Sequence, residues 1–230
     1  MPGAFEPDQL PEERRWPADD RPDRHSRRLR PTLIGAAIVA LLALGAFYSA
    51  GETLVAPQAV PRGADIVLVK SDYNHGERLA AGLRALQLTG ARRLVVFLDR
   101  RSLDWQRAQV LGDLARRQVS TENVRLAETR SDLDQARLAA GLAHRCGWRT
   151  VVVATSNWNT RRVRFLFGRA LGHGVSLSVV GTHEGFRPGQ WWRSSRDRAI
   201  VRYEWPRLVV QSLRYALAEP APRDDPSVPC

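Results

Sequence analysis

The chain beyond residue 63 alternates short apolar runs with longer stretches in which apolar residues recur at helical spacing. The short runs are rich in β-branched residues and contain few polar positions, a pattern typical of parallel strands that helices cover on both faces. We therefore predict five strands, at Ala64–Val69, Arg93–Leu98, Asn123–Ala127, Thr150–Ala154 and Val175–Val180.

The longer stretches predict helices between the strands. Ser131 and Asn157 stand before two of them as N-cap residues, and Gly90 and Gly147 follow two of them as stop signals. Because strand and helix alternate, we expect an α/β fold, a three-layer sandwich around a mainly parallel sheet. The predicted helices span Glu77–Leu88, Asp104–Arg116, Asp132–Arg145 and Trp158–Leu171, with a last helix from about Pro206 to Ala218.

A continuous apolar run precedes this domain. Residues 31–51 contain no charged side chain and no polar stripe, and as a helix they are long enough to cross a hydrocarbon core of about 30 Å. We predict an uncleaved transmembrane helix here. The alternatives are a buried core helix and a cleaved signal peptide, but Leu44 or Tyr48 would occupy a position where a cleavage site needs a small residue.

The position of the charges decides how the basic composition is interpreted. The formal net charge is +11, from 35 basic and 24 acidic residues, which suggests a nucleic-acid partner. The last basic residues before the apolar run are Arg24, Arg27, Arg28 and Arg30, and such a cluster stays on the cytoplasmic side of a membrane. We therefore expect everything after about residue 52 to lie outside the cytoplasm. A basic domain there meets phospholipid headgroups and anionic wall polymers, so we expect no nucleic-acid partner.

The cysteines and histidines indicate neither a disulfide scaffold nor a metal site. Cys146 and Cys230 are too few for a disulfide-stapled scaffold, and we expect both to be free because Cys230 lies in a proline-rich tail. The five histidines show no ligand spacing, so we predict no metal site.

Together the patterns described above divide the chain into five parts. They are a disordered cytoplasmic tail (1–30), the transmembrane helix (31–51), a linker (52–63), the α/β domain (64–218) and a disordered tail (219–230).

Polar side chains gather after the predicted strands, where parallel α/β sheets bind their ligands. Loops and helix caps are polar in most proteins, but Arg78 and Arg162 stand in first helical turns, where the helix dipole disfavours a cation. We expect these two arginines to hold a phosphate or carboxylate. The full set of ligand-binding candidates is Ser71, Asp72, Arg78, Thr129, Asp132, Thr155, Ser156, Asn159 and Arg162, with Asp134 and Glu204 as candidate catalytic acid/base residues.

Five parts of the sequence also carry a resemblance to a known family. They are Ala64-Asp65, Glu77-Arg78-Leu79, ETRSDLDQA (128–136), VATSNWNTRRVRFLFGRAL (153–171) and Tyr203-Glu204-Trp205. In their order and spacing the chain resembles, over about residues 64–210, the bacterial YdcF/SanA/ElyC-like domain. Asn159 stands where that family has a histidine, and Lys70-Ser71-Asp72 replaces its glycine-rich turn. An amide cannot move a proton as a histidine does, so these departures weaken the case for catalysis.

The resemblance implies a membrane-anchored protein of the cell envelope. Its extracytoplasmic domain would bind an anionic precursor that is phosphorylated or attached to a lipid carrier, with or without acting on it. The alternative is a degenerate, non-catalytic scaffold for cell-wall enzymes. Neither the residues nor the resemblance identifies a cofactor. The pair Trp191-Trp192, which lies among arginines, has two interpretations of its own, since it either covers the core or contacts lipid headgroups.

Overall fold

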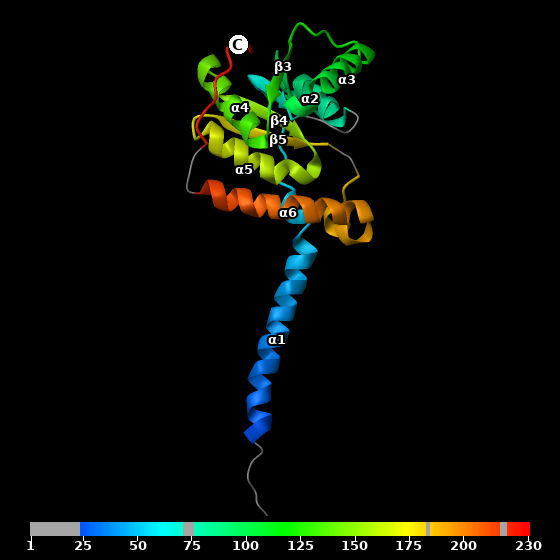
Figure 1. Cartoon of the computed structure of the whole chain (residues 1–230), viewed down its shortest axis with the longest axis vertical. Coiled ribbons are helices and arrows are strands. Elements are labelled where there is room, and N and C mark those ends of the chain that lie inside the picture. Colours follow the sequence, from blue (N-terminus) through cyan, green and yellow to red (C-terminus); the bar gives the residue numbers. More distant parts are fainter. Residues whose placement is uncertain (1–23, 71–75, 183–184, 217–219) are drawn as a thin grey trace, which may run out of the picture. The chain divides into compact units, whose positions relative to one another are not determined.

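The computed structural model of the chain describes residues 24–70, 76–182, 185–216 and 220–230 (Figure 1). The chain divides into two compact units, residues 1–44 and 45–230. Most of the predicted cytoplasmic tail, residues 1–23, lies outside the described residues.

Helix α1 spans Arg24–Ser49 and contains most of the predicted transmembrane segment. Large apolar side chains, among them Ile34, Ile38, Leu41 and Leu42, are exposed along it. Within the described part of the chain, no helix is both long enough and apolar enough to cross a membrane. The side chains of residues 31–33, where the predicted span begins, lie outside the described residues, so the span stays a prediction.

Five parallel strands form the central sheet of the larger unit, in the order β3-β2-β1-β4-β5. The sheet lies between helices, which confirms the predicted α/β class (Figure 1). The strands are β1 (Ile66–Val69), β2 (Leu94–Asp99), β3 (Val124–Thr129), β4 (Thr150–Thr155) and β5 (Ser176–Gly181), and each of them overlaps a predicted strand.

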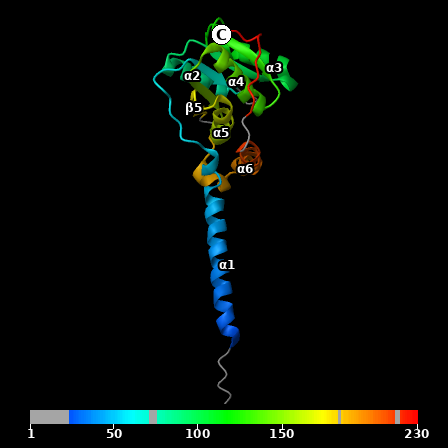
Figure 2. The same ribbon diagram turned by 90° about the vertical axis from the view of Figure 1, so that its left-hand side faces the viewer.

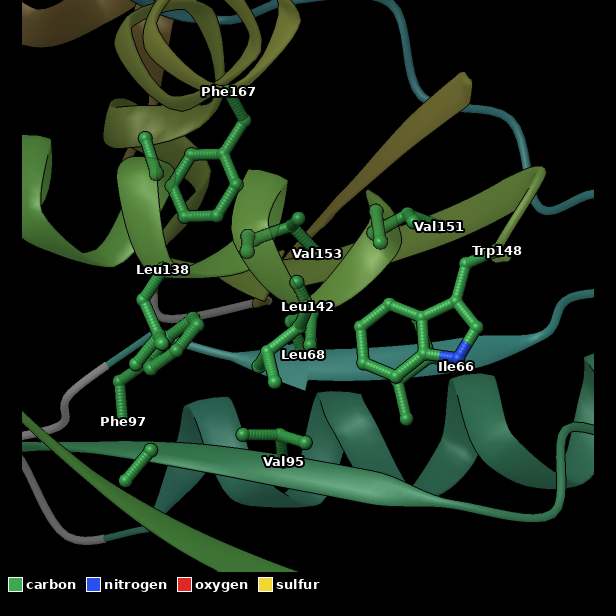
Figure 3. Packing of buried hydrophobic residues seen from close by; sticks show 14 of the residues in the cluster. Ile66, Leu68, Val95, Phe97, Leu138, Leu142, Trp148, Val151, Val153 and Phe167 are labelled. Atoms are coloured by element: carbon green, nitrogen blue, oxygen red, sulfur yellow. The ribbon is translucent and has the colours of Figure 1, made fainter. Parts of the chain in front are cut away.

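Alternate residues of the strands face opposite layers of helices, as the pleat requires. Ile66 and Leu68 of β1 pack toward α4 (Asp132–Cys146) and α5 (Thr160–Leu171). On this side Phe97 and Phe167 approach each other with ring centroids 6.4 Å apart (Figure 3). Residues of the opposite parity pack toward two other helices, α2 (Glu77–Thr89) and α3 (Leu103–Arg116).

A third cluster of buried residues attaches the last helix and the predicted linker to the domain. It contains Leu54, Trp158, Phe186, Trp191 and Val201. The segment 52–63 is therefore not a free linker in its first part, since Leu54 is buried and the backbone N–H of the buried residue 56 donates to the hydroxyl of residue 160 at 2.8 Å.

Helix α6 spans Ser195–Ala216, so the predicted start near Pro206 is wrong. The Ser194 hydroxyl accepts a hydrogen bond from the Asp197 N–H at 3.3 Å and begins the helix well before the proline, which lies inside it. Helix α6 lies next to α5 (Figures 1 and 2).

Residues 220–230 run beside α4 and are not the disordered tail that their proline content led us to expect (Figure 2). The Arg223 N–H donates to the carbonyl of Arg137 at 2.9 Å, and Val228 is buried in the core cluster of α4 and α5. Cys146 and Cys230 form a disulfide with their Cα atoms 5.4 Å apart. The expectation that both cysteines are free is therefore wrong, because the segment that carries Cys230 is held against α4.

Candidate functional site

The strand order reverses between β1 and β4, and sheets of this topology bind their ligands in a crevice beyond the carboxyl ends of such a pair of strands. Lys70 directly follows β1, and its backbone N–H donates to the carbonyl of Ala154 in β4 at 3.0 Å. Thr155 ends β4, and Ser156 follows it. Both are fully buried. The candidate site is therefore built on the rigid centre of the sheet.

Four charged side chains from four elements form a continuous chain at this point, which we call the buried ionic chain. The Lys70 Nζ lies 2.5 Å from Oδ1 of Asp132, in the first turn of α4. Arg162, in the first turn of α5, pairs with the other oxygen of Asp132 and donates through Nε to Oε2 of Glu204 in α6 at 2.9 Å. Lys70, Arg162 and Glu204 are only 4–6% exposed.

Burial and pairing act in opposite directions on these groups. Burial lowers the pKa of Lys70 to about 8, because the ion pair with Asp132 only partly offsets the loss of hydration and both Arg78 and Arg162 repel the ammonium. Burial alone would raise the pKa of Asp132, but Lys70 and Arg162 together hold it below its usual range. The pKa of Arg162 is raised, since its two carboxylate partners outweigh its burial.

Arg78 brings a third cation to the same edge. It lies in the first turn of α2, and its Nε donates to the Ser156 hydroxyl at 2.9 Å. Gly76, which precedes the helix, has φ of +74°, a conformation that favours glycine, and a Cβ there would collide with the carboxylate of Asp113. The conformation of Gly76 and its close contact with Asp113 thus fix the start of α2, from which Arg78 reaches the end of β4.

Two buried acceptors at the end of β4 lack a partner. Thr155 Oγ1 and Asn159 Oδ1 make no hydrogen bond to any residue that the structure describes, although both residues are buried. Buried polar atoms without a protein partner commonly bind water or a ligand. The Thr129 hydroxyl is different, because it donates to the carbonyl of Leu98 at 3.1 Å and so helps to join β3 to β2.

A pocket of about 310 Å³ opens at the carboxyl end of β3. Asp134 fixes one wall, because its Oδ2 accepts from the N–H of Arg130 at 2.9 Å and from the guanidinium of Arg223 at 2.7 Å. Asp132 and Asp134 both lie in the first turn of α4, so this turn borders both the pocket and the buried ionic chain. We call the cavity the arginine pocket, and its lining residues are Arg100, Glu128, Thr129, Arg130, Asp134 and Arg223.

The structure gathers most of the predicted site residues at one edge and changes their grouping. Ser71 and Asp72 lie outside the described residues. Arg78 and Ser156 meet directly, whereas Arg162 lies between two carboxylates. Both predicted acid/base residues accept hydrogen bonds from arginines, and their catalytic role stays a prediction.

Two residues of the candidate site, Lys70 and Arg223, were not among the candidates predicted from the sequence. Lys70 is the only lysine of the chain and directly follows the first strand, and this position was the signal that could have identified it. Arg223 had no comparable signal, because it lies in a proline-rich segment that the disulfide and other contacts hold beside α4. In the described part of the chain, no three His, Cys, Asp or Glu side chains converge as metal ligands do.

No protein-family model and no curated protein matches the sequence. The likeness to the YdcF/SanA/ElyC-like domain therefore stays a prediction that rests on the motifs quoted above. The geometry of the site joins several cations to buried polar groups at the carboxyl ends of the strands, where sheets of this kind bind their ligands.

Proposed function

We propose that this chain is a membrane-anchored protein of the cell envelope whose α/β domain binds a phosphorylated, anionic precursor at the carboxyl edge of the sheet. One observation carries the proposal, namely the convergence of Lys70, Arg78 and Arg162 at the point where the strand order reverses. Burial is the main cause of the lowered pKa of Lys70, and the repulsion by Arg78 and Arg162 lowers it further, so a bound anion would relieve that repulsion.

The proposed location outside the cytoplasm has two supports. The exposed apolar side chains of α1 suit a lipid environment, and Arg24, Arg27, Arg28 and Arg30 precede them. The disulfide between Cys146 and Cys230 is typical of an oxidising compartment, because thiols in the cytosol are kept reduced.

The geometry suggests different roles for the two arginines that we expected to hold the anion together. Arg78 is half-buried at the mouth of the crevice and is the better candidate for direct contact. Arg162 positions Asp132 and Glu204 and so connects α4, α5 and α6 around the site. The arginine pocket offers a second place for negative charge, since Arg100, Arg130 and Arg223 reach it from three separate segments.

The unpartnered acceptors narrow the ligand class. Asn159 Oδ1 needs a donor, which an unprotonated phosphate oxygen cannot supply and a sugar hydroxyl can. A sugar phosphate, free or linked to a lipid carrier, therefore satisfies the cations and the buried acceptor together. Because Asn159 does not titrate, we assign it a role in binding and none in proton transfer.

The test is calorimetric titration of the full chain in detergent with glucose 1-phosphate and with inorganic phosphate. Arg78→Ala removes one charged hydrogen-bond donor, so we expect its affinity for glucose 1-phosphate to fall by about tenfold to a hundredfold. Arg84→Ala is the matched control, because Arg84 is an exposed arginine of the same helix, and its affinity should stay near that of the unmodified chain.

Equal losses in Arg78→Ala and Arg84→Ala would contradict the proposed site. Failure of the unmodified chain to bind either probe would overturn the proposed function and favour the alternative, a non-catalytic scaffold for cell-wall enzymes. One observation favours that alternative, since the buried ionic chain fills the centre of the crevice with the side chains of the domain itself.

A further inference from the structure

The solvent-facing side of α6 has an unusual composition. Its two acidic residues face inward, where Asp197 accepts from the backbone of Arg187 at 3.4 Å and Glu204 accepts from Arg162. The exposed positions therefore carry no negative charge. Five of them are arginines, at positions 196, 198, 202, 207 and 214.

Large apolar side chains lie between these arginines. Tyr203, Trp205, Val210 and Leu213 are 56%, 41%, 61% and 73% exposed, although α6 has a buried side on which they could have been placed. The Arg207 guanidinium stacks on the ring of Tyr203 at 3.5 Å from its centroid. Aromatic side chains favour the headgroup level of a membrane and arginines are attracted to anionic lipids, so both kinds of exposed residue suit a membrane surface.

The same surface continues into the residues at the end of the apolar run. Phe47 and Tyr48 are about half exposed and pack on Trp191 and Trp192, with ring centroids 4.7 Å apart in each pair. The Trp191 indole donates to the carbonyl of Phe47 at 3.1 Å. Aromatic residues concentrate at the headgroup level of a bilayer, so this cluster belongs at the same depth as the proposed anchor's outer end.

A direct hydrogen bond joins the two regions. The Trp205 indole on α6 donates to the Thr53 hydroxyl at 3.0 Å, only a few residues beyond Tyr48. Aromatic cluster and arginine face are thus parts of one surface on the unit formed by residues 45–230. We call it the α6 face.

We propose that the α6 face rests on the anionic phospholipid surface of the membrane that anchors the chain. Charge complementarity identifies this partner, since α6 exposes five arginines and no acid, and these outnumber the exposed Glu52 beside the aromatic cluster. The exposed Val210 and Leu213 fit the boundary between headgroups and acyl chains, and a nucleic acid or soluble polyanion would leave them in water. The inference rests on the proposed membrane location but is independent of the ligand at the sheet edge.

The test places an environment-sensitive dye at single positions of the full chain in lipid nanodiscs. Leu213→Cys reports on the α6 face, and Leu88→Cys on α2 is the matched control, because that leucine is also exposed, at 62%. The native cysteines form a disulfide and do not react without reductant. In nanodiscs that contain phosphatidylglycerol we expect a blue shift and quenching by lipid nitroxides at position 213, and neither at position 88.

Charge reversal tests the arginines. Arg202→Glu with Arg207→Glu should shift the equilibrium away from lipid contact by about tenfold or more, because each arginine near an anionic surface contributes roughly 1 kcal/mol. Arg92→Glu with Arg93→Glu changes the net charge equally at exposed positions before β2 and should leave the dye signal at position 213 unchanged.

Three results would overturn the inference. The first is a water-like signal at position 213 in anionic nanodiscs, and the second is an equal effect of the two charge reversals. The third is a blue shift at position 213 without quenching by lipid nitroxides, which would show that a second copy of the chain or another protein surface covers the α6 face. Because glucose 1-phosphate binding is measured separately, any of these results leaves the proposed ligand site standing.

Discussion

At the scale of single residues, Lys70 and Arg162 share one carboxylate, that of Asp132. Two buried cations around one anion are stable only because Glu204 supplies a second negative charge to Arg162. Loss of one member leaves a buried charge without compensation, a condition that costs roughly 3–5 kcal/mol in other proteins. The buried ionic chain therefore behaves as one unit. The protonation of Lys70 can be followed experimentally, because it changes the free energy of unfolding as the pH is varied.

Lys70 makes the stability of the domain depend on pH in the alkaline range. Its pKa is lowered to about 8 in the folded chain, from the usual 10.5, so between these values the unfolded chain keeps a proton that the folded chain releases. The free energy of unfolding should therefore rise with pH in this window, by at most about 1.4 kcal/mol per pH unit. Urea denaturation at several pH values between about 7.5 and 10.5 measures it.

Lys70→Met is the control for this prediction. It removes the only lysine, so the remaining slope belongs to tyrosines and the N-terminal amine. A rise with pH that persists unchanged in Lys70→Met would mean that Lys70 has an ordinary pKa in the folded chain.

At the scale of elements, the contact between α4 and the C-terminal segment 220–230 holds one wall of the arginine pocket. Gly141 permits this contact, because a Cβ at that position would collide with the backbone carbonyl of Arg223. Gly112 on α3 offers a comparison, since a Cβ there would meet only the end of the Arg116 side chain at 3.7 Å. Replacement by alanine should therefore change the free energy of unfolding in opposite directions at the two glycines.

Gly141→Ala should lower the free energy of unfolding by about 1–3 kcal/mol, the usual cost of an overpacked site. Gly112→Ala should raise it by about 0.5–1 kcal/mol, because alanine restricts the unfolded chain and favours the helix. Chemical denaturation of both variants checks the pair. A stabilising effect of Gly141→Ala would show that the C-terminal segment does not pack on α4 as described.

The success of sequence-based prediction differed among the elements. Strands such as β1 and β4 are apolar at nearly every position, and this signal survives in the structure because both faces are covered. The start of α6 was misplaced because Pro206 resembles a first-turn residue and was preferred to Ser194, whose hydroxyl accepts from the N–H of Asp197 three residues later. The C-terminal segment was misjudged for a similar reason, since its prolines suggested disorder and its order comes from contacts with α4.

At the scale of the whole molecule, a disulfide joins residues that are 84 positions apart and ties the C-terminal segment to α4. Cys146→Ser, Cys230→Ser and the double variant should each lower the free energy of unfolding by about 2–4 kcal/mol, since all three remove the same cross-link. Unfolding of the unmodified chain in reductant should show the same loss. A negligible loss in the three variants would argue against this bond as a stabilising feature.

The candidate site was predictable in position and only partly in detail. The strand pattern correctly indicated that Arg78, Thr155 and Ser156 belong to one edge of a parallel sheet. Pairing inside the site was not predictable, because it depends on which side chains meet across β1, α4 and α6 after folding. Asp132 thus became the partner of both Lys70 and Arg162, which no spacing along the chain indicates.

The strand order also has a consequence for folding during synthesis on the ribosome. β1 pairs with β4, and Asp65 and Thr150 at the starts of these strands are 85 residues apart. Ribosomes add about 5–20 residues per second, so one edge of the most apolar strand waits for roughly 4–17 seconds before its partner exists. An unpaired strand edge of this kind is a template for aggregation. We therefore expect the unpaired edge of β1 to be prone to aggregation until β4 joins the sheet.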